Sequence, residues 1–204
     1  MGVAERRARE KDDLRKKILD TAADLFIEQG YENVSMRKIA DRIEYAPSTI
    51  YLHFRDKVDI VANLCAATFG ELDRRLQEIL DLGLAPLETL HRSLRAYIDF
   101  GLDHPSHYVF VFCTPTSMFK DMEQSSGEQI YGCGMGSFGR LKNGLTACMA
   151  AGVIREGDVE LLAQSTWLMV HGITAGLICQ AEFPFVDKEM LIEHSLGRLI
   201  GSLR

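Results

Sequence analysis

The chain has 204 residues, of which 47% are hydrophobic, and it carries a formal net charge of −6. This length and composition allow one large domain or two small ones with a hydrophobic core. No stretch approaches the ~18 uninterrupted apolar residues of a membrane helix, and residues 1–17 are charged and lack the apolar region of a signal peptide. The five cysteines lack CxxC spacing, which predicts reduced thiols in a cytoplasmic protein rather than a disulfide framework or a zinc site.

The charge is divided unevenly along the chain. Residues 1–60 contain 12 Lys/Arg and 12 Asp/Glu, and residues 61–204 contain the other 11 and 17, so the second part carries the whole excess (11 − 17 = −6). A neutral N-terminal part with local basic clusters fits a protein that contacts phosphate at one end only. The basic side chains of residues 1–17 are mixed with acidic ones, so we expect a solvated, frayed terminus rather than a DNA-grasping arm.

The apolar spacing is helical almost throughout, starting with the first helix. Ile18, Ala22, Leu25 and Phe26 recur at i, i+4, i+7 and i+8 and make one apolar stripe. Gly30 stands where a helix C-terminus needs a left-handed residue, a conformation that costs glycine least. We therefore expect the first helix to end there.

Two short helices and one long helix are expected next. Ser35 can cap a second helix, and Pro47 suits the first turn of a third, where its missing N–H is not needed. Asp56 can cap a fourth helix that runs to about Leu82. The apolar face of the second helix contains Met36, Ile39, Ala40 and Ile43.

The rest of the chain predicts five more helices, at about residues 86–102, 105–112, 128–151, 158–180 and 188–203. The polar stretch between Cys113 and Gly127 is interpreted as a loop, and the glycine-rich stretch after it as a broken or mobile helix. The most apolar run, 168–179, is interrupted by polar residues and is too short to span a membrane. The helix at 158–180 is apolar around most of its circumference, which predicts a homodimer through it and the last helix.

The most informative segment is SMRKIADRIEYAPSTIYLHFRDK, residues 35–57. Two short helices joined by a tight turn form a helix-turn-helix, and the second is small enough to enter a major groove ~12 Å wide. Six apolar residues are expected to hold these helices against the first: Ile39, Ala40, Ile43, Tyr45, Ile50 and Phe54. Hydroxyl, cationic and exposed residues are expected to form the DNA interface: Ser35, Arg37, Lys38, Pro47, Ser48, Thr49, Tyr51, His53 and Lys57.

Residues 10–62 resemble the tetracycline-repressor (TetR) family. The matching stretches are LDTAADLFIEQGYENVSMRKIADRI and STIYLHFRDK. The resemblance implies that Ser48, Thr49, Tyr51 and His53 are recognition-helix contacts and that Lys57 contacts a phosphate. Three residues of the turn depart from the family pattern. Glu44 replaces a glycine, which predicts a non-glycine residue forced toward positive φ; Tyr45 replaces a small core valine, and Ala46 replaces the usual serine cap.

The C-terminal part has features of an effector-binding domain. His104–Pro105 followed by Tyr108 resembles a short motif of many family members, and Trp167 with His171 and Gly172 resembles the W-H-G feature of one subclass. Aromatic and soft side chains are plentiful, as in most apolar ligand pockets, although plain core packing is the commoner explanation for each of them taken alone. The candidate ligand contacts are Tyr97, Phe100, His104, Tyr108, Phe112, Met118, Phe138, Trp167 and His171.

These observations predict an all-α protein with a helix-turn-helix DNA-binding domain at 1–62 and an effector-binding and dimerisation domain at 63–204. We expect a cytoplasmic, homodimeric repressor that a small apolar or aromatic molecule releases from a palindromic operator. No cofactor, metal, catalytic residue or membrane partner is expected. The alternatives are a helical enzyme, for which no catalytic constellation is found, and an adaptor that has lost specific DNA binding.

Overall fold

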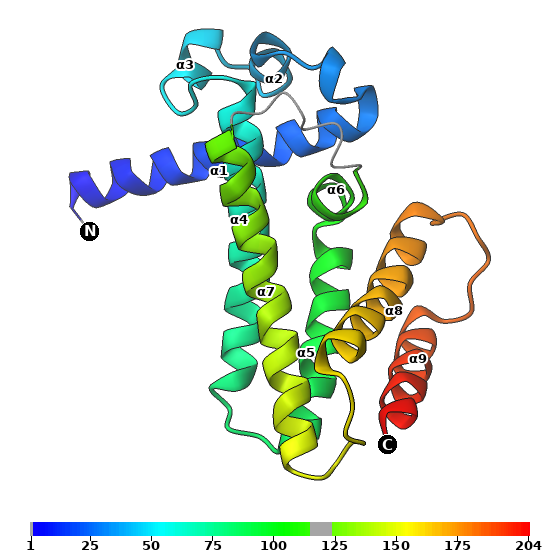
Figure 1. Cartoon of the computed structure of the whole chain (residues 1–204). Helices are drawn as coiled ribbons and strands as arrows, with labels where there is room; N and C mark the ends of the chain where they lie inside the picture. Colours follow the sequence, from blue (N-terminus) through cyan, green and yellow to red (C-terminus); the bar gives the residue numbers. More distant parts are fainter. Residues whose placement is uncertain (1, 115–123) are drawn as a thin grey trace. The chain divides into compact units, whose positions relative to one another are not determined.

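The computed structural model describes residues 2–114 and 124–204, and these form helices and turns without a strand (Figure 1). The all-α expectation is confirmed. The elements in chain order are α1 (Val3–Gln29), the 3-10 turn η1 (Tyr31–Asn33), α2 (Met36–Arg42), α3 (Pro47–Tyr51), α4 (Lys57–Leu80), α5 (Pro86–Asp103), α6 (Pro105–Tyr108), the π-helical turn η2 (Val109–Cys113), α7 (Gln124–Ala150), α8 (Val159–Cys179) and α9 (Lys188–Leu203).

The described residues divide into two compact units. Unit 1 takes its residues from 1–68 and 106–131, and unit 2 from 69–105 and 132–204. Unit 1 therefore contains the predicted helix-turn-helix together with α6 and η2. Those two elements follow α5 in the chain and were expected to belong to the C-terminal part.

The core of unit 1 is built on the apolar stripe of α1. Ile18, Ala22, Leu25 and Phe26 are all buried, as the helical spacing predicts. Phe110 of η2 is buried in the same core, where its ring stacks on Phe26 with centroids 4.9 Å apart. An aromatic residue far along the chain thus completes the support of the N-terminal helices.

The two ends of α1 differ from the expectations. The helix already begins at Val3, with the Glu5 carboxylate accepting a hydrogen bond from the Gly2 N–H at 2.8 Å, so the predicted frayed terminus is wrong. At the other end, Gly30 has φ 81° and ψ 144°, which is not the left-handed helical conformation that we expected. The chain leaves α1 extended with positive φ, a region essentially restricted to glycine.

In unit 2, α5 packs with α8 and α9. The second half of α4 is joined to α7. The Arg95 guanidinium on α5 hydrogen-bonds Glu189 and Glu193 of α9, at 2.7 Å for the shortest contact to each. The Arg140 guanidinium on α7 pairs with the Asp73 carboxylate on α4. The glycine-rich stretch does not interrupt the helix, because all of it lies within the single helix α7. The expectation of a broken helix is therefore wrong.

The predicted helix bounds agree with the structure to within a few residues. The largest difference is at α7, which begins at Gln124 rather than near residue 128. The helix α4 ends at Leu80, where a turn leads to Gly83 with φ 62°. Most of the predicted loop, residues 115–123, lies outside the described residues.

Among the described helices, α8 is long and apolar enough to cross a membrane by length and composition alone. The sequence predicts no such helix when only uninterrupted apolar runs are counted, because polar residues divide the apolar run of α8. Most of its apolar window is not buried within the single chain, and Leu161, Leu168 and Met169 are exposed. Exposed apolar residues gathered on one helix are typical of an interaction surface.

Candidate nucleic-acid interface

The helix-turn-helix has the predicted capping chemistry. The Ser35 hydroxyl accepts a hydrogen bond from the Lys38 backbone N–H at 3.3 Å and caps α2. Pro47 is in the first turn of α3, and the Asp56 carboxylate accepts from the Asp59 N–H at 2.8 Å at the start of α4. These short-range signals place the start of each helix.

The turn between α2 and α3 contains the expected strain. Glu44 has φ 62° and is the one non-glycine residue with positive φ among those described. The Tyr45 N–H reaches back to the Ala40 carbonyl at 3.0 Å, which closes the turn around Glu44. Residues other than glycine pay a steric cost at positive φ, because their Cβ approaches the backbone.

Five of the six apolar residues predicted to hold the two helices are buried, and the sixth is not. Tyr45 is 42% exposed, and its ring lies 5.6 Å from the Lys17 ammonium at the surface. The ring lies at the surface, where its polar edge meets solvent and a cation, so the prediction that Tyr45 is a core residue is wrong. The five buried residues are Ile39, Ala40, Ile43, Ile50 and Phe54.

The outer face of α3 is open to solvent. Tyr51 is 56% exposed and Leu52 is 79% exposed, while Pro47 and Ser48 are also exposed and Thr49 is half-buried. Ile50 points the other way and is fully buried. The short helix is therefore anchored by Ile50 and presents Ser48 and Tyr51 outward, with Leu52 exposed just after its end.

Arg15 of α1 holds the end of α3 in place. Its guanidinium donates to the His53 carbonyl at 2.8 Å and to the Asn63 side-chain oxygen of α4, and it stacks 4.3 Å from the centre of the Phe54 ring. One cation thus ties three segments together. Figure 1 shows α2 and α3 on the same side of α1.

His53 is held in its neutral form. Burial lowers its pKa, and the positive charges of Lys11 and Arg15 lower it further. Its Nδ1 atom is buried without a hydrogen-bond partner among the described residues. A neutral imidazole serves as a hydrogen-bonding group at neutral pH rather than as a cation for phosphate.

The predicted phosphate contacts of the first turn of α2 are on the surface. Ser35, Arg37 and Lys38 are all exposed. The Lys38 ammonium donates to the Gln29 side-chain oxygen and to the Asn33 carbonyl, both at 2.9 Å. This holds the charge beside the N-terminus of α2.

Lys57 is placed differently from the other cations. Its ammonium donates to the Tyr31 carbonyl at 2.7 Å and lies 4.0 Å from the centre of the same residue's ring. Burial lowers the pKa of Lys57, and Glu32 opposes that shift. The side chain therefore joins the start of α4 to η1.

The predicted ligand contacts fall in both units. In unit 2 the Trp167 indole N–H donates to the Tyr97 hydroxyl at 3.3 Å, and the Trp167 ring stacks on His171 at 5.4 Å. Phe100 is buried there with its ring 5.4 Å from that of His104, and Phe138 is half-buried on α7. Burial lowers the pKa of His171.

Three predicted ligand contacts come from elsewhere in the chain. Tyr108 and Phe112 belong to unit 1, where Tyr108 is fully buried and the two rings stack with centroids 4.8 Å apart. Met118 lies outside the described residues.

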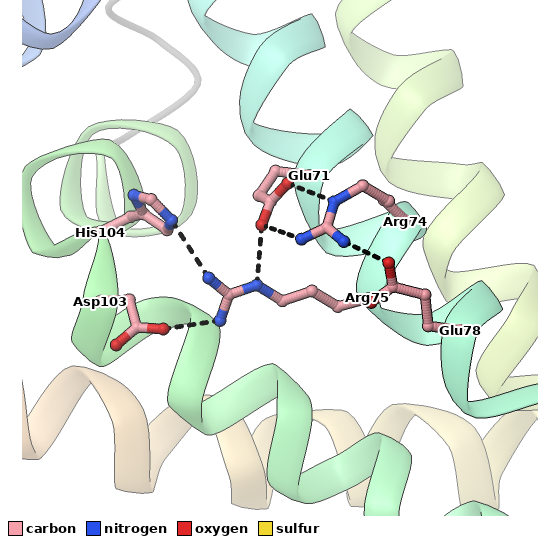
Figure 2. Close-up of polar contacts among 6 residues, drawn as sticks. All are labelled: Glu71, Arg74, Arg75, Glu78, Asp103 and His104. Atoms are coloured by element: carbon pink, nitrogen blue, oxygen red, sulfur yellow. Dashed lines mark hydrogen bonds and ion pairs between the residues drawn. The ribbon is translucent and has the colours of Figure 1, made fainter.

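Sequence reasoning missed a polar cluster around Arg75, which Figure 2 shows. The Arg75 guanidinium donates to the Glu71 carboxylate at 2.9 Å and to the Asp103 carboxylate at 2.7 Å, and it lies 3.3 Å from His104 Nε2. Because guanidinium only donates, this contact needs His104 with a free Nε2 lone pair. The i, i+4 spacing of Glu71 and Arg75 was readable in the sequence, whereas the contacts to α5 were not.

Two family models match the chain. The model described as "Bacterial regulatory proteins, tetR family" matches residues 18–64, and the model described as "Tetracyclin repressor-like, C-terminal domain" matches residues 90–199, more than half of the chain. The chain belongs to the tetR family. This confirms the resemblance drawn from the sequence, and a family of transcription regulators does not support the enzyme alternative.

TetR-family relatives of known name match over part of their length. The HTH-type transcriptional repressor KstR of Mycobacterium tuberculosis is 32% identical over 77 residues, which are 38% of this chain and 35% of KstR. The repressor KstR2 of Mycolicibacterium smegmatis is 27% identical over 110 residues, 54% of this chain and 53% of KstR2. The chain thus matches between about a third and a half of the length of these relatives.

Solved TetR-family structures share the fold over nearly the whole chain. FadR of Bacillus subtilis in complex with stearoyl-CoA has a TM-score of 0.75 at 22% identity, covering 93% of this chain and 99% of FadR. AibR in complex with isovaleryl coenzyme A and operator DNA has a TM-score of 0.75 at 19% identity, covering 91% and 97%. At these identities the likeness shows the fold.

Proposed function

We propose that this TetR-family chain is a transcription repressor that binds operator DNA through α3 and leaves it when a small molecule binds. The observation that carries the proposal is the exposed outer face of α3, which Ile50 and the Arg15 contacts hold in one orientation. A rigid short helix with an open polar face is what major-groove recognition requires. The repressors KstR and KstR2 among the relatives support repression rather than activation.

The exposed residues suggest a division of roles in DNA binding. In this proposal Ser48 and Thr49 contact base edges, while Tyr51 and the first turn of α2 contact phosphates. Lys57 uses one N–H for the Tyr31 carbonyl and has others left for a phosphate. The neutral imidazole of His53 acts as a hydrogen-bonding group at this surface.

We propose that the protein works as a homodimer joined through α8 and α9. The exposed apolar residues of α8 and the exposed Met190 of α9 supply the face. A Cβ added at Gly172 or Gly176 meets nothing within 4 Å in the single chain, so these positions leave room for a second helix to approach. Covering this face in a dimer also accounts for the apolar character of α8 in a protein that works in the cytoplasm.

We propose an acyl-CoA thioester as the effector. Two structures with this fold hold stearoyl-CoA and isovaleryl coenzyme A, and the aromatic residues of α5 and α8 are suited to an acyl chain. Residues 1–62 would then carry operator binding, and residues 63–204 effector binding and dimerisation. A ligand weakens operator binding by its differential affinity for the two states of the protein.

The decisive experiment is selection of duplexes from a randomised DNA pool, followed by binding of the selected duplex at two salt concentrations. We expect a palindromic sequence to be enriched and its affinity to fall steeply with salt. Isovaleryl-CoA and stearoyl-CoA are then compared with the corresponding free acids for release of the duplex and for a change in Trp167 fluorescence. Enrichment of no sequence would overturn the repressor function; release by none of these compounds would overturn the acyl-CoA proposal alone.

A further inference from the structure

The N-terminal end of α1 is a helical segment that packs against none of the other residues that the structure describes. Residues 4–13 are exposed all round, although α1 is continuous from Val3 to the buried Ile18. A helix that is polar on every side gains nothing from burial in its own chain. An interaction with another molecule would therefore explain the charged residues of this segment.

One face of this segment is basic and the others are mixed. Counting back from the buried Ile18 by three, four and four residues gives Arg15, Lys11 and Arg7, which therefore share a face of the helix. We call these three residues the basic stripe. Ala4, Ala8 and the partly buried Leu14 lie beside these residues on the same face.

The acidic residues of the segment lie away from the basic stripe or are engaged by other groups. Asp12 and Asp13 fall on other faces by the same helical period. Glu10 borders the stripe but pairs with Arg6 at 3.5 Å, and Glu5 accepts from the Gly2 N–H. Among the described residues, Arg7 and Lys11 make no ion pair or side-chain hydrogen bond.

The basic stripe begins at the recognition helix. Arg15 bonds the His53 carbonyl directly after α3, and Lys11, one turn before Arg15, is near enough for its charge to act on His53. In Figure 1 the first turns of α1 project past α3. Arg7 lies about 12 Å along the axis from Arg15, since a helix rises 1.5 Å per residue, and this matches the ~12 Å width of a major groove.

We infer that Arg7 and Lys11 bind the phosphate backbone of DNA beside the groove that α3 enters. Arg15 is occupied in holding α3, so the two free cations supply the contacts. The inference rests on the proposed function for the position of the DNA. It assigns the N-terminal turns of α1 a role in affinity that is independent of base sequence.

The test compares two double variants that change charge equally on opposite faces of α1. Arg7→Ala with Lys11→Ala removes the free part of the stripe, and Arg9→Ala with Lys16→Ala is the matched control, because both of its residues are exposed on the other side. Replacement by alanine favours the helix in both, which circular dichroism verifies. Arg7→Lys with Lys11→Arg keeps the charges and should behave as the wild type.

Binding is measured by fluorescence anisotropy across a salt series, on the selected duplex and on a duplex of unrelated sequence. We expect the Arg7/Lys11 variant to lower the slope of log K against log salt by about 1.8 per bound subunit, about 0.9 for each lost contact, on both duplexes. The control should keep the wild-type slope. Phosphate ethylation should cease to interfere at specific positions in the Arg7/Lys11 variant only.

The outcomes separate this inference from the proposed function. Equal slopes for the wild type and the Arg7/Lys11 variant, or equal losses in both double variants, would overturn the role of the stripe while sequence-specific binding stands. If no sequence is enriched but the slope on unrelated DNA falls only in the Arg7/Lys11 variant, the repressor function fails and the stripe remains a phosphate-binding site.

Discussion

The ammonium of Lys57 donates a hydrogen bond to the carbonyl of Tyr31 at 2.7 Å, and it lies over the ring of that same residue. A lysine that the family resemblance marks as a phosphate contact therefore also joins α4 to the end of α1 through η1. The two roles of Lys57 can be separated by experiment. The hydrogen bond to Tyr31 stabilises the protein in the absence of DNA, whereas a phosphate contact matters only when DNA is bound.

Lys57→Met should destabilise unit 1 by about 1–2 kcal/mol, since a partly buried charged hydrogen bond is lost while the side-chain stem is kept. Urea unfolding without DNA measures this loss. Arg37→Met, at a side chain that is 82% exposed, should change stability by less than about 0.5 kcal/mol. A Lys57→Met protein as stable as the wild type but with a lower salt slope would show a purely phosphate-binding lysine.

Glu44→Gly should stabilise the protein by about 0.5–1 kcal/mol, because glycine adopts positive φ without the steric cost that Glu44 bears. Glu44→Val should destabilise it, since a β-branched residue suits this conformation least. Thermal unfolding compares the three proteins. Glu44→Gln removes the same charge without relieving the cost of positive φ, so a gain in DNA affinity shared by Gln and Gly would come from charge rather than from the turn.

Phe110→Ala should cost about 3–5 kcal/mol, the usual range for deleting a fully buried phenylalanine. The loss should appear in hydrogen exchange of α1 and α2 amides, because Phe110 stacks on Phe26 in their core. Phe183→Ala removes a ring that is 60% exposed and serves as the control. Unchanged protection of α1 in the Phe110 variant would contradict the assignment of η2 to this core.

Glu71 should make the protein sensitive to acid. Hydrogen bonds from Arg74 and then from Arg75 lower its pKa from 4.5 to about 2 in the folded state. A carboxyl with a lowered folded pKa adds stability above its unfolded pKa, and this is lost as the pH falls from about 5 toward 2. The wild type should lose about 1–2 kcal/mol more than Glu71→Gln over that window, because solvent screens the pair. Parallel pH profiles of the two proteins would refute this.

Gly176→Leu should weaken the dimer and leave the single chain folded. An added Cβ at Gly176 meets nothing within 4 Å in the chain itself, so we expect the overpacking to arise mainly against a partner helix. Sedimentation velocity at micromolar concentration should show monomers for the variant and dimers for the wild type. Gly136→Leu, at an equally open glycine of α7, should remain dimeric; dimers of both variants would place the interface elsewhere.

The sequence alone was sufficient for the positions of most helices, for the starts of α2, α3 and α4, and for the recognition segment. These follow from local signals: the period of apolar residues, Ser35 and Asp56 before helix starts, and Pro47 in a first turn. Even the strain at Glu44 was predictable, because the family pattern that the chain resembles has a glycine at this position of the turn. The exposure of Ser48 and Tyr51 follows from the same helical period that buries Ile50.

Only the tertiary structure decided which side chains work together across the chain. Phe110 packing on Phe26 and Lys57 bonding the Tyr31 carbonyl join residues that no local pattern relates. Whether Tyr45 fits inside depended on the space left by its neighbours rather than on its apolar character. The free cations of α1 could be told from the occupied Arg15 only once His53 and Phe54 had been placed beside it, because the energy of a charge depends on what surrounds it in space.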